Sequence, residues 1–428
     1  LSASRLSPRL GSALPALLLA GAGGILGLAL ARLAPALLGF DPGEAAGLER
    51  ARLACLLVLG PAGLAAGAGF PLLLAVVPPG QPGPSGSLAR VYGLEALGAA
   101  LAGALFAVLL VPACPPLMIT LLAALPAAAV AVAAAPGPGR WLALAWAALV
   151  AVGLGQAGAW DRGLRQAQWP GRAIVALAET PYAQLMATRQ TGQTDFYASG
   201  LWFLSQPESQ RRQRLGLLPL LALPQARNAL FIGGAAQGAA VQMAQASRVQ
   251  VTAVEPDPWL LNFVGAHATP TAAPANLHVI HGDGRLYLQR AKGRFDLVVL
   301  DLPPPSTVQL NRFYTQEGLA ALHRALTPQG VAVLALPGPG ESLGRLQARQ
   351  LGSLVEAARA SFGQVVFLWG PELMLLCAKQ EGALADDAAI WRDRLALRPW
   401  REYDAVRDDL LEQGLDPWRR RQLLQTLE

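Results

Sequence analysis

A glycine-rich turn is the first place where this sequence could do chemistry. Gly233, Gly234 and Gly238 lie in FIGGAAQG, directly after an apolar run typical of a strand. Glycines in such a turn let the backbone approach a ligand closely, and the next helix points its positive end at the site. The turn therefore predicts a nucleoside-binding site, with a turn kept only for packing of helix on sheet as the alternative.

Acidic residues end the next three predicted strands. Glu255 ends the second strand, where a carboxylate can accept hydrogen bonds from both hydroxyls of a ribose. Asp283 ends the third strand in HGDGR and could accept from the exocyclic amine of an adenine. Asp301 ends the fourth, where it could hold an attacking amine and take its proton, or could simply cap the following loop.

Strands and helices that would position these residues are predicted by the sequence, in which apolar runs alternate with helical stretches. Strands buried on both faces read as continuous apolar runs, and this alternation predicts a doubly wound, Rossmann-like α/β sheet. Ligands bind such sheets at the carboxyl ends of the strands, where the acidic residues stand. The predicted strands are 228–233, 249–255, 277–283, 295–301, 330–337, 364–369 and 372–379.

A small β meander is predicted immediately before this domain. Its segments alternate in polarity, and Thr191-Gly192 and Ser199-Gly200 supply turns between them. The predicted strands are 172–178, 182–190, 193–199 and 201–205.

The first part of the chain has the composition of a membrane protein. The whole chain is 53% apolar and only 14% charged, against about 25% charge in ordinary soluble proteins. Long apolar runs approach the roughly 20 residues that a bilayer requires. The first run is too long for a signal peptide and others follow it. We predict five spans, at about 13–38, 53–77, 91–112, 117–135 and 141–159.

Small residues and one acid stand out within these spans. Gly23 and Gly27, and likewise Gly63 and Gly67, are four apart, which places each pair on one helix face and permits close helix packing in lipid. The alternative is that this spacing occurs by chance, because glycine is common in this chain. Glu95 is the one acid inside a neutral span, and is either functional or reaches the interface.

The orientation of the spans is weakly encoded. Arg162, Arg165 and Arg172 follow the last span, which favours a cytoplasmic back half by the positive-inside rule. We therefore expect a multi-pass protein of the inner membrane. The chain starts at Leu1 rather than Met, which leaves open whether helices precede it.

The distribution of charge and the few cysteines and histidines argue against two kinds of site, one for nucleic acid and one for a metal. The 34 basic and 28 acidic residues give a net charge of +6, but no basic stripe with interleaved aromatics appears, so nucleic-acid binding is not expected. The three cysteines and four histidines fit no metal spacing, and no metal site is expected.

The sequence predicts four parts along the chain. They are a transmembrane domain over 1–160, a linker with the β meander over 161–206, a Rossmann-like domain over 207–380 and a charged helical tail over 381–428.

At this point the motifs resemble a known family. TPYAQLMATRQTGQTDFYASG, FIGGAAQG, VEPD, HGDGR, DLPPPST and NRFYT occur in the order and spacing of the spermidine synthases. The chain is similar in particular to their bacterial membrane-embedded branch, in which a helical bundle precedes the synthase-like domain. GFPLL at 69–73 and VYGLEALGA at 91–99 resemble helices of that branch.

The resemblance implies transfer of an aminopropyl group from decarboxylated S-adenosylmethionine to an amine acceptor, without a metal. It implies that Glu255 holds the ribose, that Asp283 holds the adenine with Gly284 also in the cofactor site, and that Asp301 is the catalytic residue. A lipid bilayer is the other expected partner, and a second copy of the chain is a further option. The residues implied on the acceptor side are Tyr182, Gln184, Arg211, Arg212 and Tyr314.

Several positions depart from the family pattern, mostly on the acceptor side. Pro304 stands where the family has a second loop aspartate, and Arg211-Arg212-Gln213 stands where it has Tyr-His-Glu. Ala235 and Ala236 replace the third glycine and the following aspartate of the glycine motif. Replacing attractive charges by repulsive ones would weaken polycation binding, because each unit charge about 4 Å away is worth roughly 1 to 4 kcal/mol.

Three functional hypotheses remain open on the sequence alone. The first is a membrane-anchored aminopropyltransferase with an altered acceptor, and one variant of it has an acceptor that bears a carboxylate or phosphate. The second is a catalytically degenerate synthase-like membrane protein with a binding or structural role. The third, a methyltransferase on the same sheet, is disfavoured by the β meander and by NRFYT.

Overall fold

The computed structural model describes most of the chain and divides it into two compact units, Leu1–Ile174 and Val175–Glu428. The expected boundary after residue 160 falls inside a helix that continues to Ala167. The described residues are 14–40, 43, 47–74, 84–135, 137–207, 210–236, 238–268, 274–305, 307–338, 344–400 and 414–427.

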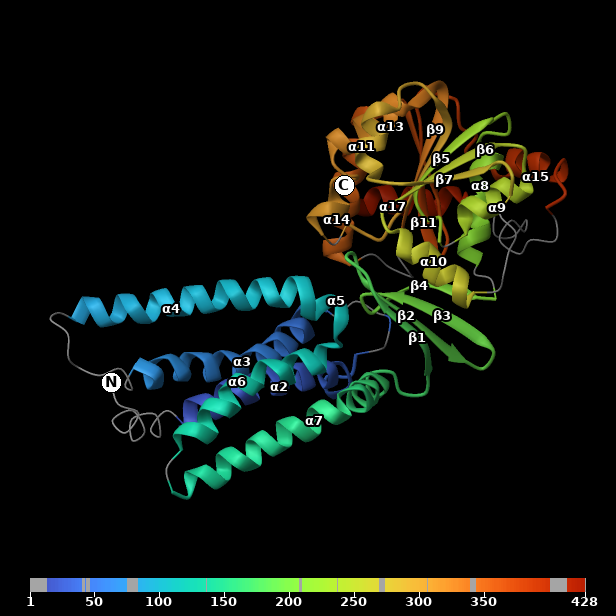
Figure 1. The fold of residues 1–428 in the computed structure, drawn as a ribbon. Coiled ribbons are helices and arrows are strands. Elements are labelled where there is room, and N and C mark those ends of the chain that lie inside the picture. Colours follow the sequence, from blue (N-terminus) through green and yellow to red (C-terminus); the bar gives the residue numbers. More distant parts are fainter. Residues whose placement is uncertain are drawn as a thin grey trace. The chain divides into compact units, whose positions relative to one another are not determined.

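The described elements of the first unit are helices, apart from the first two residues of strand β1 at its end (Figure 1). By length and composition, four of its stretches could cross a membrane: Leu17–Leu37, Tyr92–Leu110, Pro116–Ala133 and Gly139–Ala167. The predicted span 53–77 falls on helix α3 and in part outside the described residues. The elements are α2 (Leu14–Leu37), α3 (Leu48–Leu74), α4 (Pro84–Leu105), the π-helix η1 (Phe106–Leu110), α5 (Val111–Ala113), α6 (Pro116–Ala134) and α7 (Gly139–Ala167).

Helix α2 packs against α3, α6 and α7. A Cβ placed on Gly23 would lie 3.3 Å from the Cβ of Ala65 in α3, so the small face of α2 allows the close approach that its spacing predicts. Gly63 and Gly67 of α3 have no atom within 4 Å of such a Cβ among the described residues. The first glycine pair therefore serves helix packing here, and the second does not.

Three buried charged residues link α2 to α7. Arg165 Nε donates to Asp161 Oδ2 at 2.5 Å, and Arg32 Nη2 lies 3.7 Å from Asp161 Oδ1. All three residues are at most 7% exposed. Because a buried charge without a partner is strongly destabilising, the carboxylate of Asp161 fixes how the ends of these two helices meet.

The predicted β meander forms a four-stranded sheet with the order β1-β2-β3-β4. The two-residue turns after β2 and β3 both have positive φ, at 46° and 85° for Thr191-Gly192 and at 49° and 80° for Ser199-Gly200. Such turns match the twist of paired antiparallel strands. The strands are β1 (Ala173–Glu179), β2 (Gln184–Gln190), β3 (Gln193–Ala198) and β4 (Leu201–Gln206).

The predicted α/β domain is a seven-stranded sheet with the order β10-β11-β9-β8-β5-β6-β7 (Figure 1). The chain leaves β5 in one direction to β6 and β7, and later returns to its other side with β8 and β9, all parallel. A short connection makes β11 antiparallel to β10, and β11 is also antiparallel to β9. The strands are β5 (Asn228–Gly233), β6 (Gln250–Glu255), β7 (Leu277–His281), β8 (Phe295–Asp301), β9 (Leu326–Pro337), β10 (Gln364–Leu368) and β11 (Glu372–Ala378).

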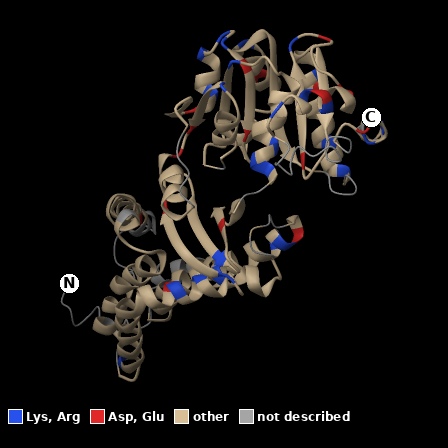
Figure 2. Ribbon diagram, turned by 90° about the vertical axis from the view of Figure 1, so that its right-hand side faces the viewer, with Lys and Arg blue, Asp and Glu red and all other residues tan. Residues whose placement is uncertain are grey.

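Helices cover both faces of this sheet and enclose two apolar cores. Alternate residues of one strand serve opposite cores: Phe231 packs with α8 and α9, whereas Leu230 and Ile232 pack with α13 and α14. Charged residues are frequent in this domain and sparse along the helices of the first unit (Figure 2). The helices are α8 (Gln210–Ala222), α9 (Ala239–Ala246), α10 (Pro258–His267), α11 (Gly284–Arg290), α12 (Val308–Asn311), α13 (Gln316–Ala325), α14 (Arg345–Ser361), α15 (Ala388–Ala396) and α17 (Pro417–Leu427).

Candidate active site

The glycine turn and Asp301 meet where the chain reverses its direction across the sheet. Gly233 of β5 is in register with Asp301 of β8. A Cβ on Gly234, whose φ is +71°, would collide with the carboxylate of Asp301. Only glycine therefore fits at 234, and the carboxylate of Asp301 lies directly against this turn. Open α/β sheets bind ligands at the carboxyl ends of their strands, at the point where the strand order reverses.

Asp301 is almost fully buried and is held in an ion pair. Its residue is 1% exposed, and its Oδ1 lies 2.5 Å from Nη2 of Arg211 in the first turn of α8. Burial by itself lowers the pKa of Arg211, but the charge of Asp301 and its hydrogen bond outweigh burial and hold the pKa above the ordinary value. Arg211 is therefore a permanent cation against the predicted catalytic carboxylate.

A second buried pair extends this ion pair into a network of four charges. Glu372, the first residue of β11, has Oε1 3.8 Å from Nε of Arg211 and Oε2 3.6 Å from Nε of Arg214. Nη2 of Arg214 also donates to the carbonyl oxygen of Trp369 at 3.1 Å. Burial raises the pKa of Glu372 despite both arginines. Arg211 and Arg214, one helical turn apart, thus share the carboxylate of Glu372.

Glu255 stands at the end of the neighbouring strand β6, and only 5% of the residue is exposed. Burial raises its pKa to about 7, against a hydrogen bond with the backbone of Asp257 that lowers it, and the charges of Asp257 and Asp301 add to the rise. The carboxylates of Glu255 and Asp301 therefore belong to one electrostatic site on either side of β5.

Asp283 has different surroundings from Glu255 and Asp301, because all its described partners are hydrogen-bond donors. Its Oδ1 accepts from the backbone N–H groups of Arg285 and Leu286 and caps α11, while Oδ2 accepts from Arg312 Nη2 at 2.8 Å. Burial would raise the pKa of Asp283, but these donors lower it below its usual range. A ligand amine would thus share an acid that already binds a helix end and Arg312.

Gly284 and Gly238, the remaining predicted glycines, lie where another side chain comes too close for a Cβ atom. A Cβ on Gly284 would lie 2.6 Å from Cγ2 of Ile232 in β5, so this glycine lets α11 pack on the sheet. Gly238 begins α9 with a φ of +82°, and a Cβ there would lie 2.9 Å from Cδ of Arg212. Arg212 also donates to Gln242 Oε1 at 3.3 Å, so it faces α9.

Two residues expected on the acceptor side have their described contacts elsewhere. Tyr182 is 60% exposed and its ring lies 6.5 Å from that of Trp259. Gln184 Nε2 donates to Glu179 Oε1 at 2.5 Å. Neither contact involves Asp301 or Arg211. The described contacts of these two side chains are with Glu179 of the small sheet and Trp259 of α10.

Tyr314, the third of these acceptor-side residues, is buried. Its residue is 6% exposed, and its hydroxyl has no hydrogen-bond partner among the described residues. Burial and the charge of Asp301 raise its pKa, whereas Arg211 lowers it. The charges of the ion pair therefore act on the Tyr314 hydroxyl, which is buried without a hydrogen-bond partner among the described residues.

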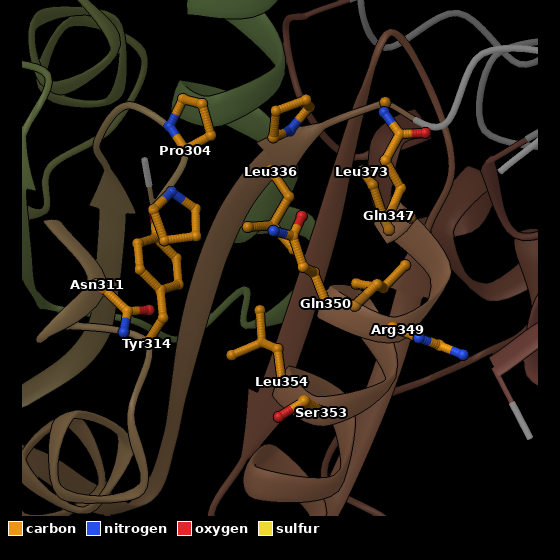
Figure 3. Close-up of a pocket in the computed structure, with 14 residues that line it drawn as sticks. Pro304, Asn311, Tyr314, Leu336, Gln347, Arg349, Gln350, Ser353, Leu354 and Leu373 are labelled. Atoms are coloured by element: carbon orange, nitrogen blue, oxygen red, sulfur yellow. The ribbon is translucent and has the colours of Figure 1, made fainter. Parts of the chain in front are cut away.

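A cavity of about 550 Å³ adjoins Tyr314. Its lining includes Pro304 from the loop after β8, Asn311 at the end of α12, the end of β9, and side chains of α14 (Figure 3). Gln347 and Gln350 supply amides to it, and Leu336, Leu351, Leu354 and Leu373 supply apolar surface. Glu255 and Asp283 do not line it, so the cavity is distinct from the predicted nucleoside crevice.

Sequence reasoning missed Glu372 and Arg214. The signal available was the spacing of Arg211 and Arg214, which puts two cations on one helical face and requires an acid opposite them. The acid could not be identified, because Glu372 arrives through the antiparallel strand β11, far along the chain. No cluster of three or more metal-ligating side chains occurs among the described residues.

Comparison with known proteins agrees with this geometry. Residues 209–339 match the family model described as the spermine/spermidine synthase domain. The chain is 28% identical over 190 residues to polyamine aminopropyltransferase 2 of Ralstonia nicotianae, which covers 41% of this chain and 37% of that protein. It is also 28% identical over 175 residues to the polyamine aminopropyltransferase of Mycobacterium tuberculosis, covering 39% and 33%.

Among solved structures, the chain is similar to a spermidine synthase in complex with the transition state analogue AdoDATO. The TM-score is 0.49 at 13% identity, over 59% of this chain and 88% of that one. The chain matches only 37% and 33% of the length of these two curated relatives. The match to residues 209–339, together with these relatives, identifies this part of the chain as a spermine/spermidine synthase domain.

Proposed function

We propose that the chain is an aminopropyltransferase that uses decarboxylated S-adenosylmethionine and an amine acceptor. The observation that carries the proposal is the buried carboxylate of Asp301, seated against Gly234 where the strand order reverses, with buried Glu255 across β5. The family match supplies the class of reaction, and the names of the curated relatives support it.

The residues present suit the co-substrate on physical grounds. Turns at Gly233 and Gly234 bring bare backbone to the crevice, and Glu255 can accept from two ribose hydroxyls. Asp301 would hold the acceptor nitrogen and take its proton. A carbon–nitrogen bond then forms at the methylene beside the sulfonium, the carbon–sulfur bond breaks with its electron pair left on sulfur, and methylthioadenosine is released.

The ion pair on Asp301 favours a second candidate, a catalytically degenerate synthase-like protein with a binding or structural role. Arg211 occupies an oxygen of the carboxylate that an acceptor amine would need. Breaking a buried ion pair is costly, about 3–5 kcal/mol when one partner is simply removed. A protein that kept this pair closed would bind nucleoside and never transfer the aminopropyl group.

One measurement separates these two functions. The full chain, purified in detergent, is titrated calorimetrically with decarboxylated S-adenosylmethionine and with methylthioadenosine. It is then incubated with the former and a panel of mono-, di- and triamines. We expect nucleoside binding and amine-dependent formation of methylthioadenosine. Binding without product from any amine would support the degenerate alternative with a binding role. The absence of binding would refute the aminopropyltransferase and leave only a structural role.

We further propose that the first unit anchors the chain in the inner membrane, with the α/β domain in the cytoplasm, where adenosyl compounds are made. The four long apolar stretches support anchoring. On fractionation, we expect the chain in the membrane pellet, resistant to alkaline carbonate and released by detergent. Release by carbonate would contradict spanning helices. A protease-accessible tag after residue 428 would report the side on which the domain lies.

A further inference from the structure

Arg211 lies between two carboxylates of the site, and it contacts them at unequal distances. Its Nη2 lies 2.5 Å from Oδ1 of Asp301, whereas its Nε lies 3.8 Å from Oε1 of Glu372. The second distance is about 1 Å longer than a charge-assisted hydrogen bond. The side chain of Arg211 is 19% exposed, against 0% for that of Asp301. A small movement of this guanidinium would therefore give Glu372 the close contact that Asp301 now has.

Arg214 holds Glu372 in position for such an exchange. Nε of Arg214 lies 3.6 Å from Oε2 of Glu372, while Oε1 is the oxygen that faces Arg211. Arg214 itself has little freedom, because its side chain is 2% exposed and its Nη2 donates to the carbonyl oxygen of Trp369 at 3.1 Å. A Cβ on Gly370 would collide with the guanidinium of Arg214, so the backbone packs closely against it. Glu372 is thus held on one side by a fixed cation.

The proposed reaction needs the carboxylate oxygen that Arg211 now contacts. An amine attacks only when it is neutral, so Asp301 must accept its proton, and a guanidinium on Oδ1 competes with the amine for this carboxylate. Separating a buried cation from its partner is strongly unfavourable unless another carboxylate receives the cation. Glu372 already lies within ion-pair distance of Arg211 and is largely buried.

We propose that Glu372 is a positioning residue that receives Arg211 when the acceptor amine binds, and thereby frees Asp301 to take the proton of the amine. The inference rests on the proposed aminopropyl transfer and adds to it the step that makes Asp301 available. Ion pairs are exchanged in this step and no covalent bond breaks. Glu372 acts through Arg211 rather than on the reacting atoms.

The test measures methylthioadenosine formation from decarboxylated S-adenosylmethionine by the full chain in detergent, at varied amine concentration. Putrescine is the first acceptor, and n-butylamine and spermidine are used where putrescine does not react. The variant Glu372→Gln keeps the shape of the side chain but loses the charge that receives Arg211. We expect KM for the amine to rise about tenfold, within the range of couplings between residues of one charge network. The kcat at saturating amine should change little, because excess amine still displaces Arg211.

This division between KM and kcat separates positioning from a purely structural role. Loss of folded protein would lower kcat and leave the KM of the remaining enzyme unchanged. The matched control is Glu356→Gln, which removes an exposed acid of α14 and should change neither constant. Calorimetric binding of methylthioadenosine by each variant checks that the α/β domain is folded.

The second background is Arg211→Gln, which removes the cation that competes for Asp301. This variant should have a lower KM for the amine than the unaltered chain. Adding Glu372→Gln to it should change KM by less than about twofold, because the proposed effect of Glu372 requires Arg211. Since Arg211→Gln is measured with Glu372 intact, the inference remains testable where Glu372→Gln alone does not fold.

The outcomes are distinct. An unchanged KM in folded Glu372→Gln, an equal rise in KM in both backgrounds, or a KM that does not fall in folded Arg211→Gln would overturn the inference and leave aminopropyl transfer standing. If the unaltered chain binds methylthioadenosine but forms none from any of the three amines, the proposed function fails and the inference fails with it.

Discussion

The variant Asp301→Asn is expected to lower the rate of methylthioadenosine formation by about 10²- to 10⁴-fold, the usual contribution of a positioned general base. Asn keeps the shape against Gly234 but cannot accept the proton of the attacking amine. Nucleoside affinity should change little, because Glu255 and the glycine turn remain. Initial rates at saturating amine, with calorimetry of methylthioadenosine, measure the two effects separately. Full turnover by this variant would remove Asp301 from the mechanism.

The same substitution should also destabilise the α/β domain. It leaves the guanidinium of Arg211 buried with only Glu372 at 3.8 Å, and removing one partner of a buried pair costs about 3–5 kcal/mol. The double variant Asp301→Asn/Arg211→Gln should recover thermal stability but not activity. A double variant less stable than Asp301→Asn would show that Arg211 is held by something other than this pair.

The second large effect is the pH dependence of nucleoside binding through Glu255. Ribose hydroxyls donate to the ionised carboxylate, and burial raises the pKa of this group to about 7. The ionised fraction rises about tenfold between pH 6 and pH 8, so the Kd for methylthioadenosine should fall about tenfold over that range. Calorimetry in buffers of different ionisation enthalpy would detect the released proton. A flat profile would contradict the role of Glu255.

Glu255→Gln is the control for this titration. It should flatten the pH profile and weaken binding at pH 8, where the native carboxylate is charged. The unliganded protein should respond oppositely. Because the folded pKa lies above the unfolded value, the stability associated with neutral Glu255 is complete below about pH 4.5 and is lost as pH rises to about 7. The variant should therefore melt at a higher temperature than the native chain at pH 8, and at a similar one near pH 4.5.

The sheet and its ligand edge were predictable because their signals are local. Apolar runs define strands, and Gly233, Glu255 and Asp301 each end one of them. Parallel strands must present their carboxyl ends at one edge, so the side on which these residues meet follows without coordinates. The two hairpins of the small sheet were equally predictable, since Thr191-Gly192 and Ser199-Gly200 are short turns between alternating segments.

The ionic partners of Asp301, the predicted catalytic carboxylate, were decided by tertiary structure. The sequence indicated that arginines replace the family's acceptor residues, but it could not show that Arg211 reaches Asp301 while Arg212 turns to α9. Nor could it place Glu372, which joins the network through an antiparallel strand. Charge pairing in a core depends on distances of a few ångströms between residues far apart in the chain. Local spacing therefore determined where the site lies, and only the packing of α8, β8 and β11 together determined its charge.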